Sequence, residues 1–479
     1  MTKKTLFSSI QLQSQNRSLM TIIRDIKEAL AGSSQDYTKI PLGKAVFLLA
    51  IPMVLEMVME SIFAVVDIYF VGKLGAEAVA TVGITESILT IVYAIAFGLS
   101  MATTALVSRR IGEKKPEEAS KEGLQAILTG VFISLGIALP GIFGAKELLR
   151  LMGASPQIVD EFSGYTSVMF GGNLVIMLLF INNAIFRGAG DAAIAMRVLW
   201  MANGLNIILD PLLIFGIGPF PEMGITGAAV ATNIGRGLAV MYQFYLMWSG
   251  KGRISMKHLP ILVEWKRISH LVKISLGGIA QSLIATSSWV FMVRIISNFG
   301  SEVLAGYTIG IRVIIFCLLP SWGLSNAAAT LVGQNLGAGH SDRAEKAVWG
   351  VARINMLFLG SLSLIFIIFP EVFIGLFTDD PEVIKYGVEC LRIISYGFVF
   401  YGLGMVMIQA FNGAGDTRTP TRINIFAFWM VEIPLAYLLA IPLGFQETGV
   451  FFAIIIAEAC MTILSMYLFK KGRWKRESV

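Results

Sequence analysis

Charged residues are scarce in this chain. Asp, Glu, Lys and Arg make up 15% of the 479 residues, whereas hydrophobic residues make up 55% and the mean hydropathy is +0.72. So little polar surface cannot cover a water-soluble globular protein of this length. The composition therefore predicts a polytopic membrane protein, and the net charge of +6 is interpreted as a feature of membrane topology rather than of nucleic-acid binding.

Several motifs of enzymes and ATP-driven pumps are also missing. The sequence contains no G-x-x-x-x-G-K-[S/T] phosphate loop, no H-E-x-x-H and no G-x-S-x-G. The three cysteines, Cys317, Cys390 and Cys460, fall in apolar stretches, where they are expected to pack without forming disulfides. We therefore expect no enzymatic activity and no cofactor, and any uphill transport must draw on an ion gradient.

Twelve apolar stretches are long enough to cross a membrane, which takes about 20 mostly apolar residues in a helix. The first half contains residues 44–70, 78–105, 122–142, 161–185, 193–215 and 223–248. The second half contains residues 268–296, 302–330, 346–370, 383–410, 420–442 and 448–470. The predicted fold is an all-α membrane protein with twelve transmembrane helices.

The two halves repeat each other. The stretch 106–121 returns as 331–346, and 186–191 (FRGAGD) returns as 411–416 (FNGAGD), both displaced by 225 residues. Chance matches would not share one register. The sequence therefore predicts two six-helix lobes related by parallel internal duplication, an architecture that recurs in secondary transporters.

The spans divide the chain into five predicted parts. These are a cytoplasmic extension at 1–43, a first lobe at 44–250, an inter-lobe linker at 251–267, a second lobe at 268–470 and a basic tail at 471–479. In the extension, apolar residues recur at helical spacing, namely Leu19, Ile22, Ile23, Ile26 and Leu30. This spacing predicts a short amphipathic helix on the inner membrane surface. A disordered extension is the alternative.

The distribution of basic residues predicts the orientation. If the amino terminus is cytoplasmic, the outer loops keep only Lys73, Lys146, Arg150 and Lys385, and the other basic residues, including Arg187, lie on the inner side. An excess of Lys and Arg marks cytoplasmic loops. We therefore expect a multi-pass protein of the cytoplasmic (inner) membrane with both termini in the cytoplasm.

Three acids lie within the first predicted span. Glu56, Glu60 and Asp67 are four and seven residues apart, so they lie within about 40° of one another around a helix. An ionisable group at this depth costs about 2.5 to 3.5 kcal/mol on insertion scales and marks a functional site by default. The three acids are therefore expected to face the protein interior.

A second polar stripe lies in the fifth span, where Asn203, Asn206 and Asp210 share one face. Two such stripes imply a shared pocket, to which Thr232 of the sixth span is expected to add a hydroxyl group. Carboxylate and amide oxygens suit a proton or sodium ion. Structural roles remain open, because amides commonly bond neighbouring membrane helices and Arg236 is a possible counter-cation.

The second half lacks these acids. The displacement of 225 residues pairs the four first-half acids with neutral residues, namely Gln281, Ala285, Met292 and Leu435. Ion coupling is therefore predicted for the first half. Two other second-half acids, Glu432 and Glu458, are expected to form structural pairs, with Arg294, Arg312 and Arg392 as candidate partners.

Several motifs together resemble the multidrug and toxic compound extrusion (MATE) family over residues 36–470. They are Ile51-Pro52, Val66-Asp67 before Gly72 and Gly75, the repeated loops at Leu106 and Leu331, the Asn206–Pro211 run, and the loops 187–191 and 412–417. The resemblance implies two six-helix lobes in a V. It also implies export of cationic or amphiphilic drugs in exchange for protons or sodium, with essential carboxylates at Asp67 and Asp210 and an asparagine at Asn206. Any sodium ion would be held by these three residues.

The chain departs from one branch of this family. That branch has a second-lobe cation site with an acid on helix 7, whereas the nearest position here is Gln281. The departure favours a first-lobe site. Met57, Tyr307 and Gln281 are candidate drug-contacting residues, and Glu56 and Glu60 are candidates for tuning ion choice or meeting the drug's charge. The expected partners are a drug and membrane lipids, with the chain acting as a monomer, and a flippase for lipid-linked sugars is the alternative function.

Overall fold

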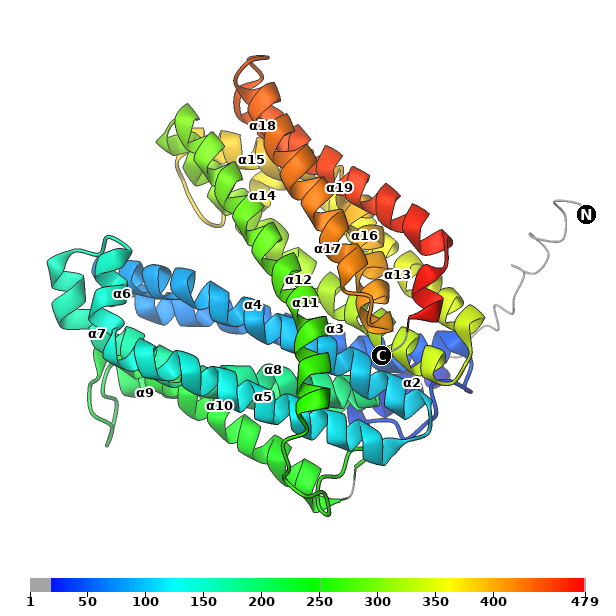
Figure 1. The fold of residues 1–479 in the computed structure, drawn as a ribbon. Coiled ribbons are helices and arrows are strands. Elements are labelled where there is room, and N and C mark those ends of the chain that lie inside the picture. The colour runs from blue at the N-terminus through cyan, green and yellow to red at the C-terminus, as the bar shows by residue number, and fades with distance from the viewer. Residues whose placement is uncertain (1–18, 251, 478–479) are drawn as a thin grey trace, which may run out of the picture.

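The computed structural model describes residues 19–250 and 252–477, which form helices and connecting loops without a β-strand (Figure 1). The first half contains α2 (Leu19–Ala31), α3 (Leu42–Gly72), α4 (Ala76–Gly112), α5 (Pro116–Phe143), α6 (Ala145–Leu151), α7 (Pro156–Gly171), α8 (Asn173–Ala189), α9 (Ala192–Ile214) and α10 (Gly224–Ser249). The second half contains α11 (Trp265–Ile296), α12 (Ser301–Gly337), α13 (Ser341–Ile368), α14 (Pro370–Ile374), α15 (Pro381–Ser395), α16 (Phe398–Ala414), α17 (Arg418–Asn424), the π-helical η2 (Ile425–Glu432), α18 (Ile433–Ala440) and α19 (Gln446–Lys470). The predicted all-α fold is confirmed.

Most predicted spans coincide with apolar helices. In the described residues, ten helical segments are long and apolar enough to cross a membrane, and the pair α15 and α16, bent by 56°, makes an eleventh. The sixth predicted span coincides with α10, whose 26 residues are long enough. Its apolar run is interrupted by the buried side chains of Thr232, Arg236 and Gln243. α10 is therefore a polar member of the bundle.

The fourth span is divided where two helices touch. α7 ends and α8 begins at Gly172, which leaves room for the Asn233 side chain of α10. Asn233 donates to the backbone oxygen of Val168 at 3.1 Å, and the same oxygen accepts from the Gly172 amide at 2.9 Å. The break is thus explained by an inter-helix hydrogen bond rather than by a proline.

The two halves form bundles that converge at the end where α2 and the carboxyl terminus lie and diverge at the end where α6 and α18 lie (Figure 1). α3 packs against α12, and α4 packs against α11. Close approach needs glycine at both crossings. A Cβ atom on Gly278 would lie 2.8 Å from the Cα of Gly98, and one on Gly323 would collide with the carbonyl group of Met53. Each half therefore packs closely on the first two spans of the other.

The segment between α2 and α3 binds both halves at the convergent end. Asp36 forms a 2.6 Å ion pair with Lys114, and the Tyr37 hydroxyl donates to the backbone oxygen of Gly190 at 3.1 Å. From the second half, Arg343 donates to the backbone oxygen of Tyr37 at 3.1 Å. These contacts connect the halves in addition to the helix crossings.

The predicted amphipathic helix coincides with α2, although Leu19 and Ile22 lie outside the residues whose side chains are described. Ile23 is exposed, and Asp25 is buried beside Lys44 of α3 at 3.9 Å. α2 packs against α3. The helical part of the prediction is confirmed, whereas its location on a membrane surface stays a prediction, as do the five chain divisions.

Candidate functional site

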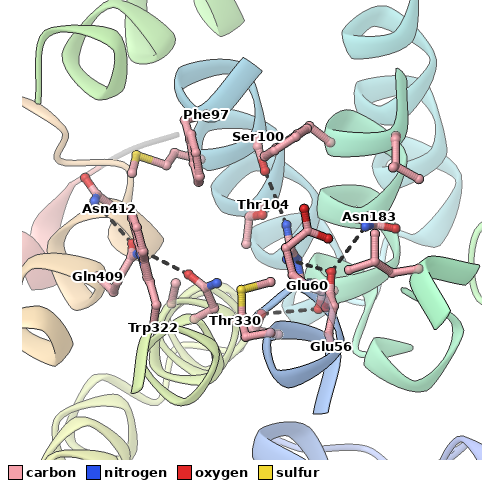
Figure 2. Close-up of a pocket in the computed structure, with 18 of the residues that line it drawn as sticks. Glu56, Glu60, Phe97, Ser100, Thr104, Asn183, Trp322, Thr330, Gln409 and Asn412 are labelled. Atoms are coloured by element: carbon pink, nitrogen blue, oxygen red, sulfur yellow. Dashed lines mark hydrogen bonds and ion pairs between the residues drawn. The ribbon is translucent and has the colours of Figure 1, made fainter. Parts of the chain in front are cut away.

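A cavity of about 280 Å³ is lined by residues of α3, α4, α8, α9, α10, α12 and α16 (Figure 2). Its walls carry two acids, two arginines, several amides and an aromatic cluster. The polar lining residues are Glu56, Glu60, Ser100, Thr104, Asn183, Arg187, Arg236, Asn326, Thr330, Gln409 and Asn412. The first half supplies both acids and both arginines. We call this the first-half cavity.

Glu56 is buried and paired with arginine. Its Oε1 atom accepts from Arg187 Nη1 at 3.2 Å and from Asn183 Nδ2 at 3.2 Å, whereas Oε2 has no hydrogen-bond partner in the described part of the chain (Figure 2). Gln243 of α10 donates to Asn183 Oδ1 at 2.7 Å, which orients the amide toward Glu56. The Glu56 charge is therefore compensated within the first half.

Glu60 lies one turn further along α3 and also faces an arginine. Arg236 Nη2 of α10 lies 3.5 Å from Glu60 Oε1, and Asn203 Nδ2 donates to Oε2 at 2.9 Å. The guanidinium group of Arg236 also lies 5.5 Å from the centre of the Phe63 ring. Arg236 thus serves as the expected counter-cation, but its ion pair is with Glu60 rather than with Asp67 or Asp210.

Asp210, on α9, is completely buried. In the amide orientation that satisfies both of its polar atoms, Asn206 donates to Asp210 Oδ2 at 2.8 Å. The Asn206 oxygen accepts from the backbone nitrogen of Thr232 at 3.0 Å and from its hydroxyl group at 2.9 Å. The structure therefore brings together three of the predicted ion-coupling residues.

Asp67, on α3, is not hydrogen-bonded to these three residues in the described part of the chain, but it lies near enough to interact with Asp210 electrostatically. It is partly buried, and its charge acts on Asp210 and on Arg236. Asp67, Asn206, Asp210 and Thr232 are called the oxygen group below. No three His, Cys, Asp or Glu side chains gather as a metal site in the described part of the chain. A cation here would therefore depend on amide and hydroxyl oxygens as well as on carboxylates.

The aromatic wall of the first-half cavity joins the two halves. The Phe97 ring of α4 stacks on Trp322 of α12, with centroids 5.4 Å apart and planes 5° from parallel, and Phe180 lies against Phe97 at 5.1 Å. Met57 lines the cavity, and its contact with a drug stays a prediction. Tyr307 lines neither described cavity and is buried against Phe451, with ring centroids 6.1 Å apart.

A second cavity of about 350 Å³ lies among α11, α12, α16, η2 and α19. We call it the second-half cavity. Gln281 lines it and exchanges hydrogen bonds with Asn412 at 3.1 and 3.2 Å. It therefore contacts a different cavity from Met57, although both are candidates for drug contact.

The expected pairing of Glu432 and Glu458 with arginine is wrong. Glu432 accepts from the Ser288 hydroxyl at 2.7 Å, and Glu458 Oε2 has no hydrogen-bond partner in the described part of the chain. Of the candidate partners, Arg392 pairs with Glu371 at 2.8 Å. Arg294 and Arg312 have exposed side chains. These two buried acids thus differ from Glu56 and Glu60.

Arg187 is the main cavity residue that sequence reasoning misplaces. The charge distribution assigns it to the inner loops, but it occupies the last turn of α8 and lines the first-half cavity beside Glu56. The internal repeat contains a sequence signal for the position of Arg187. The same displacement that pairs Glu56 with Gln281 pairs Arg187 with Asn412, and both second-half residues are polar.

Comparisons with known proteins agree over nearly the whole chain. A family model described as MatE matches residues 52–212 and 279–438, one match in each half. A probable multidrug resistance protein NorM of Thermotoga maritima is 26% identical, over 91% of this chain and 94% of its own length. An FAD transporter of Shewanella oneidensis is 24% identical, over 90% and 95%. The structure titled "Outward-facing conformation of a multidrug resistance MATE family transporter of the MOP superfamily" superposes with a TM-score of 0.85, at 23% identity, over 91% of this chain and 97% of that one.

Proposed function

The chain belongs to the MATE family of transporters, and we propose that it exports cationic or amphiphilic organic compounds in exchange for protons or sodium ions. The proposal comprises alternating access, with external ions binding to the oxygen group and cargo leaving from the cavities. It places the protein in the cytoplasmic membrane with both termini in the cytoplasm, because basic residues are concentrated in the loops on that side. The proposal also takes the chain to act as a monomer, because two lobes of one chain can form the transport pathway.

One observation carries the ion coupling. Asp210 is completely buried, it is bonded to Asn206, and the charged group that acts on it is a second acid, Asp67. Two carboxylates in a low-dielectric site repel each other, and a bound proton or sodium ion removes that repulsion. The oxygen group therefore has a physical reason to take up a cation from outside.

The helix α3 connects ion binding to the cargo cavity. It carries Asp67 in the oxygen group and Glu56 and Glu60 in the wall of the first-half cavity. Pro52 lies inside the same helix, at a place where the backbone lacks one hydrogen-bond donor and bends more readily. Ion binding moves the cavity wall if the ion prefers one shape of α3 over another.

The chemistry of the cavities supports organic cargo. The first-half cavity combines carboxylates with stacked aromatic rings and methionine, and flexible apolar groups of this kind suit sites that accept many ligands. The name of the Thermotoga maritima relative refers to multidrug resistance, and this agrees with drug export. The name of the Shewanella relative refers to FAD, an anionic compound, whereas both arginines of the first-half cavity in this chain are paired with acids, which favours cationic cargo.

An ion gradient can supply enough free energy for the proposed export. One charge that crosses 100 mV releases about 2.3 kcal/mol, which corresponds to roughly 50-fold accumulation of cargo. Two such charges would sustain a ratio of several thousand. An exchanger that moves one or two net charges inward per cycle could therefore keep toxic compounds at low internal concentration, whereas one-for-one exchange of monovalent cations draws only on the concentration gradient of the ion.

Efflux of ethidium from liposomes containing the purified protein tests this proposal, with a proton gradient and a sodium gradient imposed in separate experiments. We expect one of the two gradients to stimulate efflux and the variant Asp67→Asn to lose that stimulation. Glu447→Gln is the matched control, because Glu447 is a buried acid of α19 that lines neither described cavity. Gradient-driven efflux that survives Asp67→Asn would show that the mechanism is wrong.

The flippase alternative gives the opposite result in the same liposomes. Scrambling of a lipid-linked sugar without gradient-driven ethidium efflux would favour it. A lipid pyrophosphate calls for several free basic groups in a central cavity. Arg187 and Arg236 are each paired with an acid, whereas Arg294 and Arg312 are exposed. These observations favour the exporter.

A further inference from the structure

The second-half cavity combines an apolar wall with one acid. Its lining includes Trp322, Tyr401, Phe428, Met405, Met461 and Glu458. Its volume of about 350 Å³ is within the range of small-molecule sites, about 300 to 1,000 Å³, which are mostly apolar with a few polar groups. The cavity therefore has the size and composition of a ligand site.

Glu458 is a charge without compensation in this cavity. Its side chain is 6% exposed, and Oε2 has no hydrogen-bond partner in the described residues. The charged group that acts on it is another acid, Glu432, which itself is bonded only to the Ser288 hydroxyl among its described contacts. A buried carboxylate in such surroundings is costly unless a cation or a proton neutralises it.

A second polar atom is free in the same wall. The Oδ1 atom of Asn424, a residue that is 7% exposed, has no hydrogen-bond partner in the described part of the chain. An amide oxygen accepts hydrogen bonds, so it suits an N–H group of a ligand. Glu458 and Asn424 therefore provide one anionic contact and one hydrogen-bond acceptor.

The apolar wall determines the class of cation. An inorganic ion would gain little from Trp322, Tyr401 and the methionines, whereas a flat organic cation gains ring stacking, cation–π and sulfur–aromatic contacts. We propose that the second-half cavity binds a lipophilic aromatic monocation that carries an N–H group, with Glu458 as its counter-charge and Asn424 as the acceptor. The inference deepens the proposed function by assigning cationic cargo to this cavity.

The first-half cavity is a less favourable place for the same ligand. Its acids already face Arg187 and Arg236 at 3.2 and 3.5 Å. A cation would have to displace a guanidinium group there, whereas Glu458 has no ion pair to break among the described residues. Organic cations therefore bind preferentially in the second-half cavity.

Equilibrium binding of ethidium to the full-length purified protein in detergent, measured by fluorescence anisotropy without any gradient, tests the inference. Close charge pairs contribute about 1.5 kcal/mol or more to binding, so we expect Glu458→Gln to weaken binding about tenfold or more. Ala285→Phe keeps the acid but fills the cavity and should also weaken binding. Glu447→Gln, on the same helix as Glu458 and outside the cavity lining, should bind as the wild type does.

Photolabelling locates the ligand independently of these variants. Ethidium monoazide should crosslink to α11 and α19, which line only the second-half cavity, and labelling of α3 and α8 instead would overturn the inference. Wild-type affinity in both Glu458→Gln and Ala285→Phe would also overturn it. Thermal unfolding of each variant checks that lost binding is not lost folding, and photolabelling of the wild type distinguishes the two cavities even if the variants unfold.

Failure of this inference can be distinguished from failure of the proposed export. If gradients drive ethidium efflux but Glu458→Gln binds ethidium normally, the exporter stands and this site does not. If Glu458→Gln loses binding but neither gradient drives efflux, the cavity is a cation site in a protein that is not an ion-coupled exporter.

Discussion

Equivalent positions are charged in the first half and neutral in the second. The ion pair Glu56–Arg187 corresponds, after the displacement of 225 residues, to the amide pair Gln281–Asn412, and both pairs are in direct contact. The duplicated scaffold thus keeps the contact between the first and fourth spans of each half and changes its chemistry. The comparison teaches that the helix positions were retained while the electrostatics diverged.

The second ion pair shows the same change. Glu60–Arg236 corresponds to Ala285–Met461, and both of these apolar residues line the second-half cavity. The buried acids of the second half are instead Glu432 and Glu458, which correspond to Ile207 and Asn233 and so arose at other positions. The first half therefore holds compensated charges and the oxygen group, whereas the second holds uncompensated acids beside an apolar cavity.

The largest expected effect comes from making the oxygen group resemble its second-half equivalent. Asp210→Leu introduces the residue type of Leu435 and removes the carboxylate that an ion would neutralise. An ion gradient equivalent to 100 mV sustains roughly 50-fold accumulation of cargo per net charge moved. In Asp210→Leu this accumulation ratio should fall to about one. Ethidium accumulation in liposomes measures this ratio.

Glu447→Gln serves as the matched control for that experiment and should keep its gradient response. Asp210→Leu removes repulsion with Asp67 but also the acceptor of the buried Asn206 amide, so thermal unfolding of the variant is measured alongside transport. If Asp210→Leu still responded to the gradient, ion coupling would not be confined to the first half.

The next effect concerns stability. Glu56→Gln leaves the Arg187 guanidinium group without its counter-charge in a mostly buried site, which should cost about 3 to 5 kcal/mol of unfolding free energy. The double variant Glu56→Gln with Arg187→Asn reproduces the amide pair of the second half and should recover most of this loss. Thermal or denaturant unfolding in detergent measures both.

The double variant is the decisive control in that series. If the double variant were as unstable as Glu56→Gln alone, an amide pair like that of the second half could not replace the ion pair at this position. Stability data alone do not depend on cargo or ion, so they probe the internal comparison independently of transport.

A smaller loss of stability is expected from a substitution in the second half. Gln281→Leu removes the hydrogen bonds to Asn412, but Asn412 keeps a bond to Gln409 at 3.2 Å. Net contributions of neutral hydrogen bonds are about 1 kcal/mol, so the unfolding free energy should fall by about that amount. A loss as large as that of Glu56→Gln would mean that neutral and charged pairs are equally sensitive, contrary to the comparison.

The sequence is sufficient to predict the helices and the polar stripes. Predicted spans overlap the observed helices, with ends that differ by up to seven residues, because apolar length is a local property. Asn206 and Asp210 meet as predicted, since residues four apart share a helix face. Periodicity does not specify which neighbouring helix a face meets, so the pairings of Arg187 and Glu458 required the structure.

The predictions for Tyr307 and Arg187 show the same limit of sequence reasoning. Tyr307 is a reasonable cavity candidate by its sequence position, but it is buried in the hydrophobic core against Phe451. Arg187 resembles a cytoplasmic loop residue because it follows an apolar stretch, and only the position of Glu56 on α3 explains why it turns inward. Tertiary contacts, not local propensity, decide both.

The smallest expected effect concerns the contacts at the convergent end of the molecule, which do not involve the cavities. Asp36 is partly buried, which opposes its ionisation, but hydrogen bonds from Lys114 at 2.6 Å and from Thr38 outweigh this and lower its pKa to about 2. A carboxylate with a lowered pKa stabilises the fold above its ordinary value near pH 4, and that stability is lost as pH falls toward 2.

Because Asp36 is partly solvated, Asp36→Asn should cost only about 0.5 to 1 kcal/mol near neutral pH. The difference in unfolding temperature between wild type and variant should narrow as the pH is lowered from 5 to 3. Asp342→Asn is the control, because Asp342 is 90% exposed in its ion pair with Lys475 and should change stability less. A difference that stayed constant down to pH 3 would show that the Asp36 charge does not stabilise this junction.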